Sequence, residues 1–144
     1  YGAIEALSFA DAGVVATASD TAKFVTRCLI SNLSRSNPDV VVLEFGDGIF
    51  GDYGVQSVLD DVEVKQWLHT VVLCANDPAG AWGACRFLKR LGIEVQVVAG
   101  PVTDNEVGRS FIQKRLGLTP ANARTNPETL IKKVYGEVKP NVVS

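Results

Sequence analysis

Carboxylates and glycines follow directly after the most apolar run of this chain, Val40-Val41-Val42-Leu43. The stretch L-E-F-G-D-G-I-F-G-D-Y-G, from Leu43 to Gly54, contains three acids and four glycines. A carboxylate at the end of a buried strand is costly unless a basic side chain, backbone N–H groups or a cation balances its charge. Glu44 is in that position. Hard cations take oxygen ligands, so we favour a Mg²⁺ contact for Glu44 over a structural salt bridge.

The glycines allow a second interpretation, because residues 46–51 (G-D-G-I-F-G) match G-x-G-x-x-G. After a strand, this spacing predicts an NAD(P)-binding Rossmann-type domain. Two features argue against it: Asp47 would bring negative charge close to the pyrophosphate, and Asp52 and Gly54 interrupt the helix that should begin there. A third alternative is a non-catalytic binding or interaction domain, in which Glu44 and Asp11 pair with arginines.

Continuous apolar runs predict the strands that would position these residues, because parallel strands buried on both faces have this pattern. Three are clear: Val40–Phe45, Thr70–Ala75 and Val95–Ala99. A fourth is expected near the start of the chain, within Ile4–Ala10 or within Gly13–Thr17. We favour Ile4–Ala10, because Asp11 and Gly13 would then end the strand.

Helical patterns separate the strands, and each has a plausible start or stop signal. The first expected helix runs from Ser19 or Asp20 to just before Asn37-Pro38, and one or two short helices follow within Tyr53–Leu68. The next runs from Pro78, capped by Asp77, to Gly92. Another begins after a cap at Asp104, and the last runs from Pro127 to Tyr135.

Strands that alternate with helices predict an α/β fold. We expect an open, mainly parallel sheet with helices on both faces, a three-layer arrangement that is P-loop NTPase-like or Rossmann-like. The 144 residues suit a single domain, 1–144. Ligands of such sheets bind beyond the carboxyl ends of the strands. There the sequence places Asp11 and Glu44, and further along the chain Asn76-Asp77 and Gly100-Pro101.

Composition excludes several classes of function. The net charge is −2 and there is no basic tract, so we expect neither nucleic acid nor a membrane surface as partner. No apolar run approaches the roughly 20 residues of a membrane helix, and no signal peptide is recognisable. Three cysteines in apolar contexts suggest core residues of a reducing, cytoplasmic protein. A single histidine, His69, excludes a His/Cys zinc cluster and a Ser-His-Asp triad, and no catalytic residue is identified.

The run V-V-V-L-E-F-G-D-G, residues 40–48, resembles the Walker B strand of P-loop NTPases. It is most similar to the branch of dethiobiotin synthetase and the cobyrinic acid amide synthases. The resemblance implies that Glu44 helps to hold Mg²⁺ on the phosphates of ATP or GTP. Asp11-Ala12-Gly13 is similar to the acidic turn that these enzymes place near the same metal. Gly46 and Gly48 would let the backbone approach the nucleotide.

Two later segments extend the resemblance to the base-binding side. Residues 72–77 (V-L-C-A-N-D) resemble the strand whose terminal Asn contacts the nucleotide base, which implies nucleotide-binding roles for Asn76 and Asp77. Residues 97–101 (V-V-A-G-P) resemble the next strand, whose loop borders the base, and so imply roles for Gly100 and Pro101.

The phosphate-binding loop of that family, G-x-x-x-x-G-K-[ST], does not occur in these residues. We therefore expect the chain to be the C-terminal part of a larger protein, an ATP- or GTP-dependent ligase or hydrolase when complete. Its expected partners are a small-molecule nucleotide and either the missing N-terminal segment or a second copy of the chain, because a sheet that lacks a strand exposes an edge that invites pairing.

Overall fold

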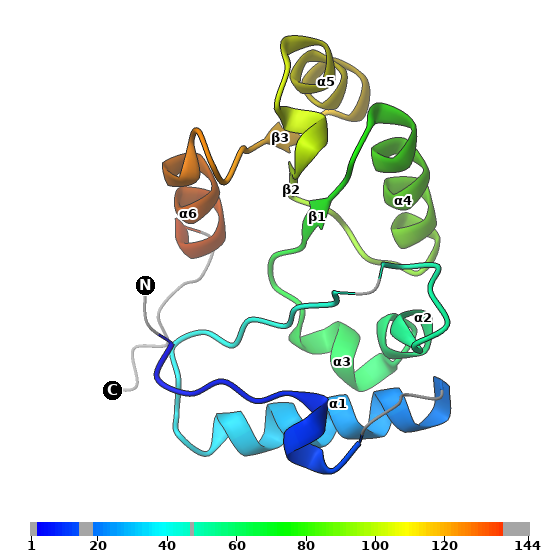
Figure 1. Cartoon of the computed structure of the whole chain (residues 1–144), viewed down its shortest axis with the longest axis vertical. Coiled ribbons are helices and arrows are strands. Elements are labelled where there is room, and N and C mark those ends of the chain that lie inside the picture. Colours follow the sequence, from blue (N-terminus) through cyan, green and yellow to red (C-terminus); the bar gives the residue numbers. More distant parts are fainter. Residues whose placement is uncertain (1–2, 15–18, 47, 137–144) are drawn as a thin grey trace. The chain divides into compact units, whose positions relative to one another are not determined.

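The structure, a computed structural model, describes residues 3–14, 19–46 and 48–136 of the chain (Figure 1). Contacts divide the described residues into two compact units, residues 3–67 (the N-terminal unit) and residues 68–136 (the C-terminal unit). The described chain is α/β and contains a small, open, parallel sheet of three strands, as the order of elements predicts. The single domain and the finer three-layer arrangement stay predictions.

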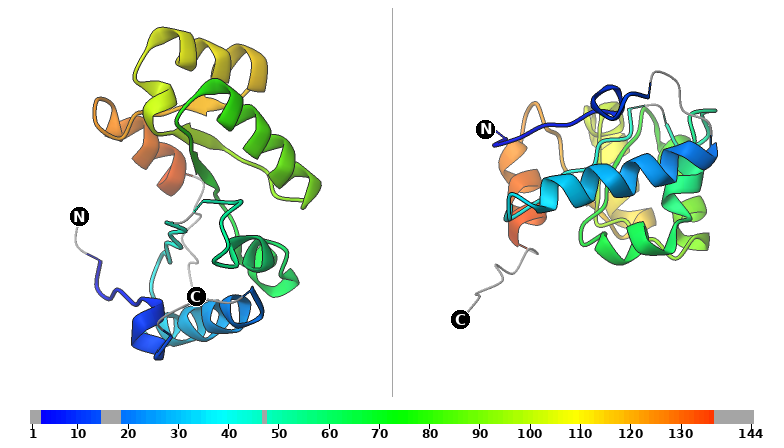
Figure 2. Two further views of the ribbon diagram at one scale, coloured as in Figure 1. Left: turned by 45° about the vertical axis from the view of Figure 1, so that its right-hand side comes forward. Right: turned by 90° about the horizontal axis from the view of Figure 1, so that it is seen from below.

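The N-terminal unit is helical. Its elements are the 3₁₀ turn η1 (Phe9–Ala12) and the helices α1 (Ser19–Ser34), α2 (Val55–Leu59) and α3 (Val62–Trp67). The long first helix and the two short helices are confirmed. Helix α1 contacts both α2 and η1 (Figure 2).

The first two predicted strands are not formed as expected. Residues 40–45 belong to no strand, and the prediction for Val40–Phe45 is therefore wrong. Within Ile4–Ala10 there is no strand either, because the chain enters η1 at Phe9. The alternative, Gly13–Thr17, falls largely on residues outside the described part of the chain.

A small apolar core explains the path of residues 40–45. Leu43 and Phe45 pack, together with Phe9, against a buried cluster of three side chains from the helices, Ala22, Val58 and Val64. Val42 and Glu44, which alternate with them, are exposed. The segment therefore has the two-residue periodicity of a half-buried strand. It stabilises the fold, however, by packing its side chains on a helical core and not by pairing with another strand.

An ion pair joins α1 to the start of α3. Arg27 donates through Nε to Asp61 Oδ1 (3.1 Å) and through Nη2 to Asp61 Oδ2, and its Nη1 reaches Glu63 (2.9 Å). Asp61 Oδ1 also accepts from the backbone N–H groups of Glu63 and Val64, as a helix N-cap does. The hydrogen bond from Arg27 is the main reason that the pKa of Asp61 lies below its usual value.

The C-terminal unit contains the sheet (Figure 1). Its elements in chain order are β1 (Val72–Cys74), α4 (Pro78–Arg90), β2 (Val97–Ala99), η2 (Pro101–Thr103), α5 (Glu106–Phe111), the π-helical turn η3 (Ile112–Leu116), β3 (Thr119–Pro120) and α6 (Pro127–Gly136). The strands predicted within Thr70–Ala75 and Val95–Ala99 are confirmed, as are the helices from Pro78 and Pro127. The short strand β3 was not predicted.

The strands lie in the order β1-β2-β3 and pair in parallel. The register places Leu73 opposite Val98, and Val98 opposite Pro120. Both crossovers run in the same direction across the sheet, so right-handed connections put α4 and the α5–η3 segment on the same face. Helix α4 indeed contacts η3. Successive side chains of the central strand, Val97 and Val98, are both fully buried, which is typical of a parallel strand.

Helix starts in this unit use side-chain caps. The side chain of Asp77 accepts from Gly80 N (2.8 Å) at the start of α4, so its predicted capping role is confirmed. The cap of α5 is Asn105, which accepts from Gly108 N (2.9 Å). The prediction that Asp104 caps this helix is therefore wrong by one residue, because α5 begins only at Glu106 and the Asp104 side chain has another partner, given below.

The structure bears on two properties that were inferred from composition. The cysteines are not all core residues: Cys28 and Cys74 are exposed and Cys85 is half-buried, with burial raising the pKa of its thiol. The second property concerns membranes: no helix among the described residues is long and apolar enough to span a bilayer.

Replacing Asp61 by Asn is expected to destabilise the protein. The folded pKa of Asp61 is depressed, so the stability it contributes is present above its unfolded pKa of about 4 and is lost as the pH falls through the folded value. Thermal unfolding should therefore show a gap in Tm between wild type and Asp61→Asn at neutral pH that closes in acid. The matched control is Asp60→Asn, which alters an exposed pair with Lys65. An equal effect at both positions would contradict the role given to the Arg27 pair.

Two helical glycines should respond in opposite ways to alanine. A Cβ at Gly108 would lie 1.8 Å from the Val102 carbonyl oxygen, whereas one at Gly83 would have no neighbour within 4 Å. We expect Gly83→Ala to raise the free energy of unfolding by about 0.5–1 kcal/mol, the usual helical gain. Gly108→Ala should lower it by about 1–3 kcal/mol, because the backbone must move apart. Denaturant unfolding of both variants checks this, and a stabilised Gly108→Ala would show that the contact is not tight.

Candidate functional site

The three parallel strands end at one edge of the sheet, which we call the carboxyl edge. It consists of the loops that follow β1, β2 and β3: residues 75–77, 100–105 and 121–126. Four of the sequence-predicted site residues, Asn76, Asp77, Gly100 and Pro101, belong to the first two of these loops.

The loops after β1 and β2 are joined through Ala75. Its N–H donates to Ala99 O (3.0 Å), and its carbonyl oxygen accepts from Val102 N (3.1 Å). Gly100 crosses this point with a φ of 88°, and a Cβ there would lie 2.8 Å from Ala75 O. Only glycine suits both the backbone conformation and the close approach. The loops that carry Asn76 and Pro101 are therefore held together.

The polar residues after β1 differ in which hydrogen-bonding groups remain free to bind a ligand. Asn76 and Asp77 are both exposed. Asp77 already accepts the hydrogen bond that caps α4. No described residue forms a hydrogen bond with the side chain of Asn76, which leaves its amide N–H₂ and its carbonyl oxygen able to bind both donors and acceptors.

Asn122 connects the loops after β2 and β3. Its Nδ2 donates to Thr103 Oγ1 (3.0 Å) and to Asp104 Oδ1 (2.8 Å). Its Oδ1 accepts from the backbone N–H groups of Arg124 and Thr125, each at 2.9 Å. The side chain is buried, with only 7% of the residue exposed. The loop after β3 is thereby fixed to the loop after β2.

Sequence reasoning missed Asn122 because it missed β3. A strand of two residues that contains proline carries almost no strand signal, since Pro cannot donate to a ladder and is confined to edges and strand starts. The available signal was weak: an Asn that follows Thr119-Pro120 within a polar stretch.

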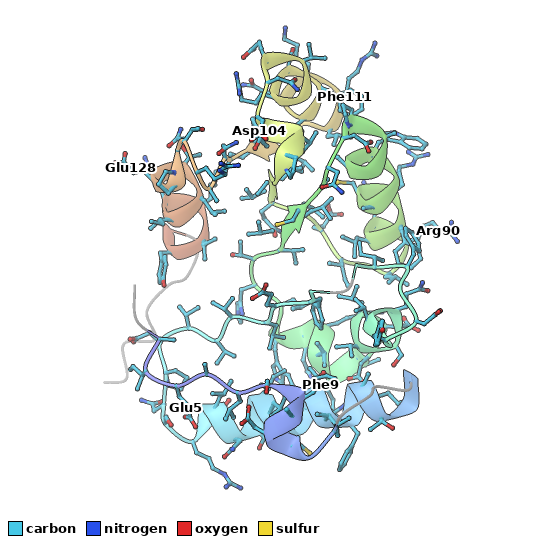
Figure 3. The ribbon with its side chains drawn as sticks, viewed as in Figure 1. Glu5, Phe9, Arg90, Asp104, Phe111 and Glu128 are labelled. Carbon is cyan, nitrogen blue, oxygen red and sulfur yellow. The ribbon has the colours of Figure 1, made fainter. Side chains whose placement is uncertain are left out.

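Thr103 and Arg109 complete the network on the β2 side. Thr103 is fully buried, and its hydroxyl donates to Gly100 O (2.7 Å) while accepting from Asn122. Arg109 donates to Thr103 O (2.8 Å) and forms an ion pair with Glu106 (3.1 Å). The carboxyl edge is thus polar, yet its buried groups are satisfied within the protein. Figure 3 shows Asp104 in this loop, between the end of β2 and α5.

The other sequence-predicted residues belong to the N-terminal unit. Glu44, Gly46 and Gly48 are exposed, and Asp47 lies outside the described residues. Glu44 therefore does not end a buried strand, and the argument that burial forces a partner on it does not hold. Helix α2 begins only at Val55, so residues 46–51 lack the strand before and the helix after that a dinucleotide fingerprint needs.

Asp11 has a local role. Its Oδ2 accepts from Ser8 N and Ser8 Oγ, both at 2.7 Å, and the hydrogen bond from the Ser8 hydroxyl is the main cause of its lowered pKa. Within the described part of the chain, neither Asp11 nor Glu44 forms an ion pair, which does not favour the arginine-paired alternative. No group of three or more His, Cys, Asp or Glu side chains among the described residues is arranged to hold a metal ion. Metal binding by Glu44 and Asp11 stays a prediction.

Comparison with known proteins adds no identification: no protein family, no curated protein and no solved structure matches this chain significantly.

Removing the Thr103 hydroxyl should weaken the carboxyl edge. Thr103→Val keeps the shape but removes one of the two donors to Gly100 O, which also accepts from Thr103 N, and removes an acceptor of Asn122, at an expected cost of about 1–3 kcal/mol. The control is Thr125→Val in the neighbouring loop, where the side chain is exposed and only the backbone N–H is bonded to Asn122. Denaturant unfolding measures both, and equal stabilities would show that the network adds nothing.

Proposed function

We propose that this chain is a P-loop NTPase- or ligase-like domain that binds ATP or GTP with Mg²⁺, and that its carboxyl edge binds the nucleoside part. The observation that carries the proposal is the joined loops after β1 and β2, which present Asn76 and Pro101 exposed at the carboxyl ends of parallel strands. Open parallel sheets bind their ligands at this position.

The loops after β1 and β2 suit a base and a ribose better than a phosphate. Their exposed polar groups include the amide of Asn76 and the carboxylates of Asp77 and Asp104, whereas the loop after β3 exposes Arg124. The amide can pair with the edge of a base, and carboxylates accept hydrogen bonds from amino, imino and hydroxyl groups. The phosphate loop of the family does not occur in these residues, so this chain alone should bind nucleotides weakly.

Magnesium fits the donors that the sequence pointed to. Glu44 is an exposed carboxylate without an ion-pair partner among the described residues, and Asp11 keeps one carboxylate oxygen that Ser8 does not use. Such oxygens are the ligands that Mg²⁺ prefers. In the proposed function these two residues hold the ion.

The three-layer arrangement belongs to the same proposal. A three-stranded parallel sheet with α4 and the α5–η3 segment on one face is compatible with the C-terminal half of such a fold. In this view, a further segment of the protein or a second copy of the chain would be the partner.

Nucleotide binding can be tested on the chain itself by NMR. Titration of the ¹⁵N-labelled protein with ATP or GTP in the presence of Mg²⁺ should shift the amide signals of Asn76, Gly100 and Thr103. Asn76→Ala should weaken binding roughly fivefold, the loss of one hydrogen bond.

The matched control is Gln113→Ala, which removes an exposed amide from η3, away from the carboxyl edge, and should leave the affinity unchanged. The absence of shifts at the carboxyl edge at about 10 mM of either nucleotide, a concentration that detects even millimolar affinity, would refute the proposal. Shifts caused by NAD or NADP alone would favour the dinucleotide alternative.

A further inference from the structure

Helix α4 has one exposed face that combines an aromatic ring with positive charges. Four exposed residues share this face, which we call the α4 face: Trp82, Arg86, Lys89 and Arg90. At about 3.6 residues per turn, their spacing confines them to an arc of about 100° on the helix. Leu88, on the other side of the helix, is buried. Figure 3 shows the side chain of Arg90 pointing away from the sheet at the end of α4.

The cations of the α4 face have no acidic partner among the described residues. Helix α4 contains no Asp or Glu, and no ion pair in the described part of the chain involves its arginines or its lysine. The turn η3, which contacts α4, exposes Lys114 and Arg115. Residues 68–136 contain nine Lys and Arg and five Asp and Glu, a formal charge of +4. The electrostatic potential around the α4 face should therefore be positive.

Trp82 is the feature of the α4 face that charge alone does not explain. Lys89 and Arg90 also complement the dipole at the C-terminal end of the helix, but an exposed tryptophan has no such role. Trp82 is 50% exposed, and the guanidinium carbon of Arg86 lies 5.4 Å from the centre of its ring. This cation–π contact orients the arginine. Trp and Arg are the residue types most enriched among the side chains that dominate binding energy at protein interfaces.

The helix surface beside Trp82 leaves room for a partner's side chain. Ala79 is exposed, and a Cβ added to Gly83 would meet no atom within 4 Å. The N-terminal half of the α4 face is therefore apolar and has only small residues next to the ring, whereas the C-terminal half carries the cations. An apolar side chain fits the first half, and carboxylates fit the second.

The length and the charge of the α4 face favour an acidic peptide over a nucleic acid. The three cations, from Arg86 to Arg90, span only about 6 Å of the helix axis, which a few carboxylates of a short peptide can cover. The chain as a whole carries a net charge of −2 and has no basic tract, so it should repel a long polyanion at a distance. Guanidinium groups bind carboxylates through two parallel hydrogen bonds.

We propose that the α4 face is a docking surface for an acidic peptide segment of a partner protein. An apolar side chain of the partner packs on Trp82, and its carboxylates pair with Arg86, Lys89 and Arg90. The inference goes beyond the proposed function and does not depend on it, because these cations lie at the end of α4 away from the carboxyl edge, where the helix begins.

The test compares two peptide probes on the wild-type chain. A short fluorescein-labelled peptide in which Glu alternates with Leu should bind with a dissociation constant of about 10–100 μM at low salt and more weakly as salt is added. The same peptide with Gln in place of Glu should bind at least tenfold more weakly. In ¹⁵N spectra, the acidic peptide should shift the indole N–H signal of Trp82 and leave that of Trp67 in place.

Variants then locate the binding surface. Arg86→Gln and Trp82→Ala should each weaken binding of the acidic peptide about tenfold, the loss of one charge-assisted contact or of the aromatic anchor. The matched control is Lys132→Gln, which removes an exposed cation from α6 and should leave the affinity unchanged. Equal weakening by Arg86→Gln and Lys132→Gln would show general electrostatic attraction and overturn the proposal.

The remaining outcomes are also decisive. No binding of the acidic peptide, or equal binding of the Gln peptide, overturns the docking surface, and the wild-type comparison decides this even if a variant does not fold. Tighter binding of single-stranded oligothymidylate than of the peptide, with a shift of the Trp82 indole signal, would replace the acidic peptide by a nucleic acid. Failure of the nucleotide titration at Asn76, Gly100 and Thr103 would refute only the proposed function.

Discussion

The C-terminal unit depends on hydrogen bonds that continue a very short parallel ladder beyond the strands. Strands β1 and β2 have three residues each and β3 has two, fewer than the five or six of an average strand. The ladder is prolonged at the carboxyl edge by Ala75 N to Ala99 O and by Ala121 N to Val98 O, and then by the Asn122 side chain. The loops are therefore part of what holds the strands in register.

This dependence explains which parts of the C-terminal unit could be predicted from the sequence. Strand β2 lies in the apolar stretch Val95–Ala99, which only Gln96 interrupts, and is buried on successive residues, so composition alone indicates it. The start of α4 is equally clear, because Asp77-Pro78 combines a capping residue with the proline favoured at the first helical position. By contrast, β3 is recognisable only from the neighbour it pairs with, and the role of Asn122 depends on β3.

The prediction for Val40–Phe45 failed for a different physical reason. An apolar run indicates that its side chains are buried, but it does not indicate which residues they pack against. Here Leu43 and Phe45 are partly buried against helices, while Val42 and Glu44 are exposed. A strand also requires a hydrogen-bonding partner, and the local sequence carries no information about whether one is present. For the same reason Glu44 could be recognised as unusual, whereas its exposure could not be foreseen.

The carboxyl edge combines fixed and adaptable groups, and this bears on how it would bind a ligand. On the β2–β3 side, the buried Thr103 and Asn122 are fully engaged, so this part of the loop is ordered before a ligand arrives. Each side chain that binding need not immobilise avoids a cost of about 0.5–1.5 kcal/mol. On the β1 side, Asn76 is exposed and can rotate to suit a donor or an acceptor. Asn76 can therefore adapt to different ligands, whereas the arrangement of Thr103 and Asn122 is set before binding.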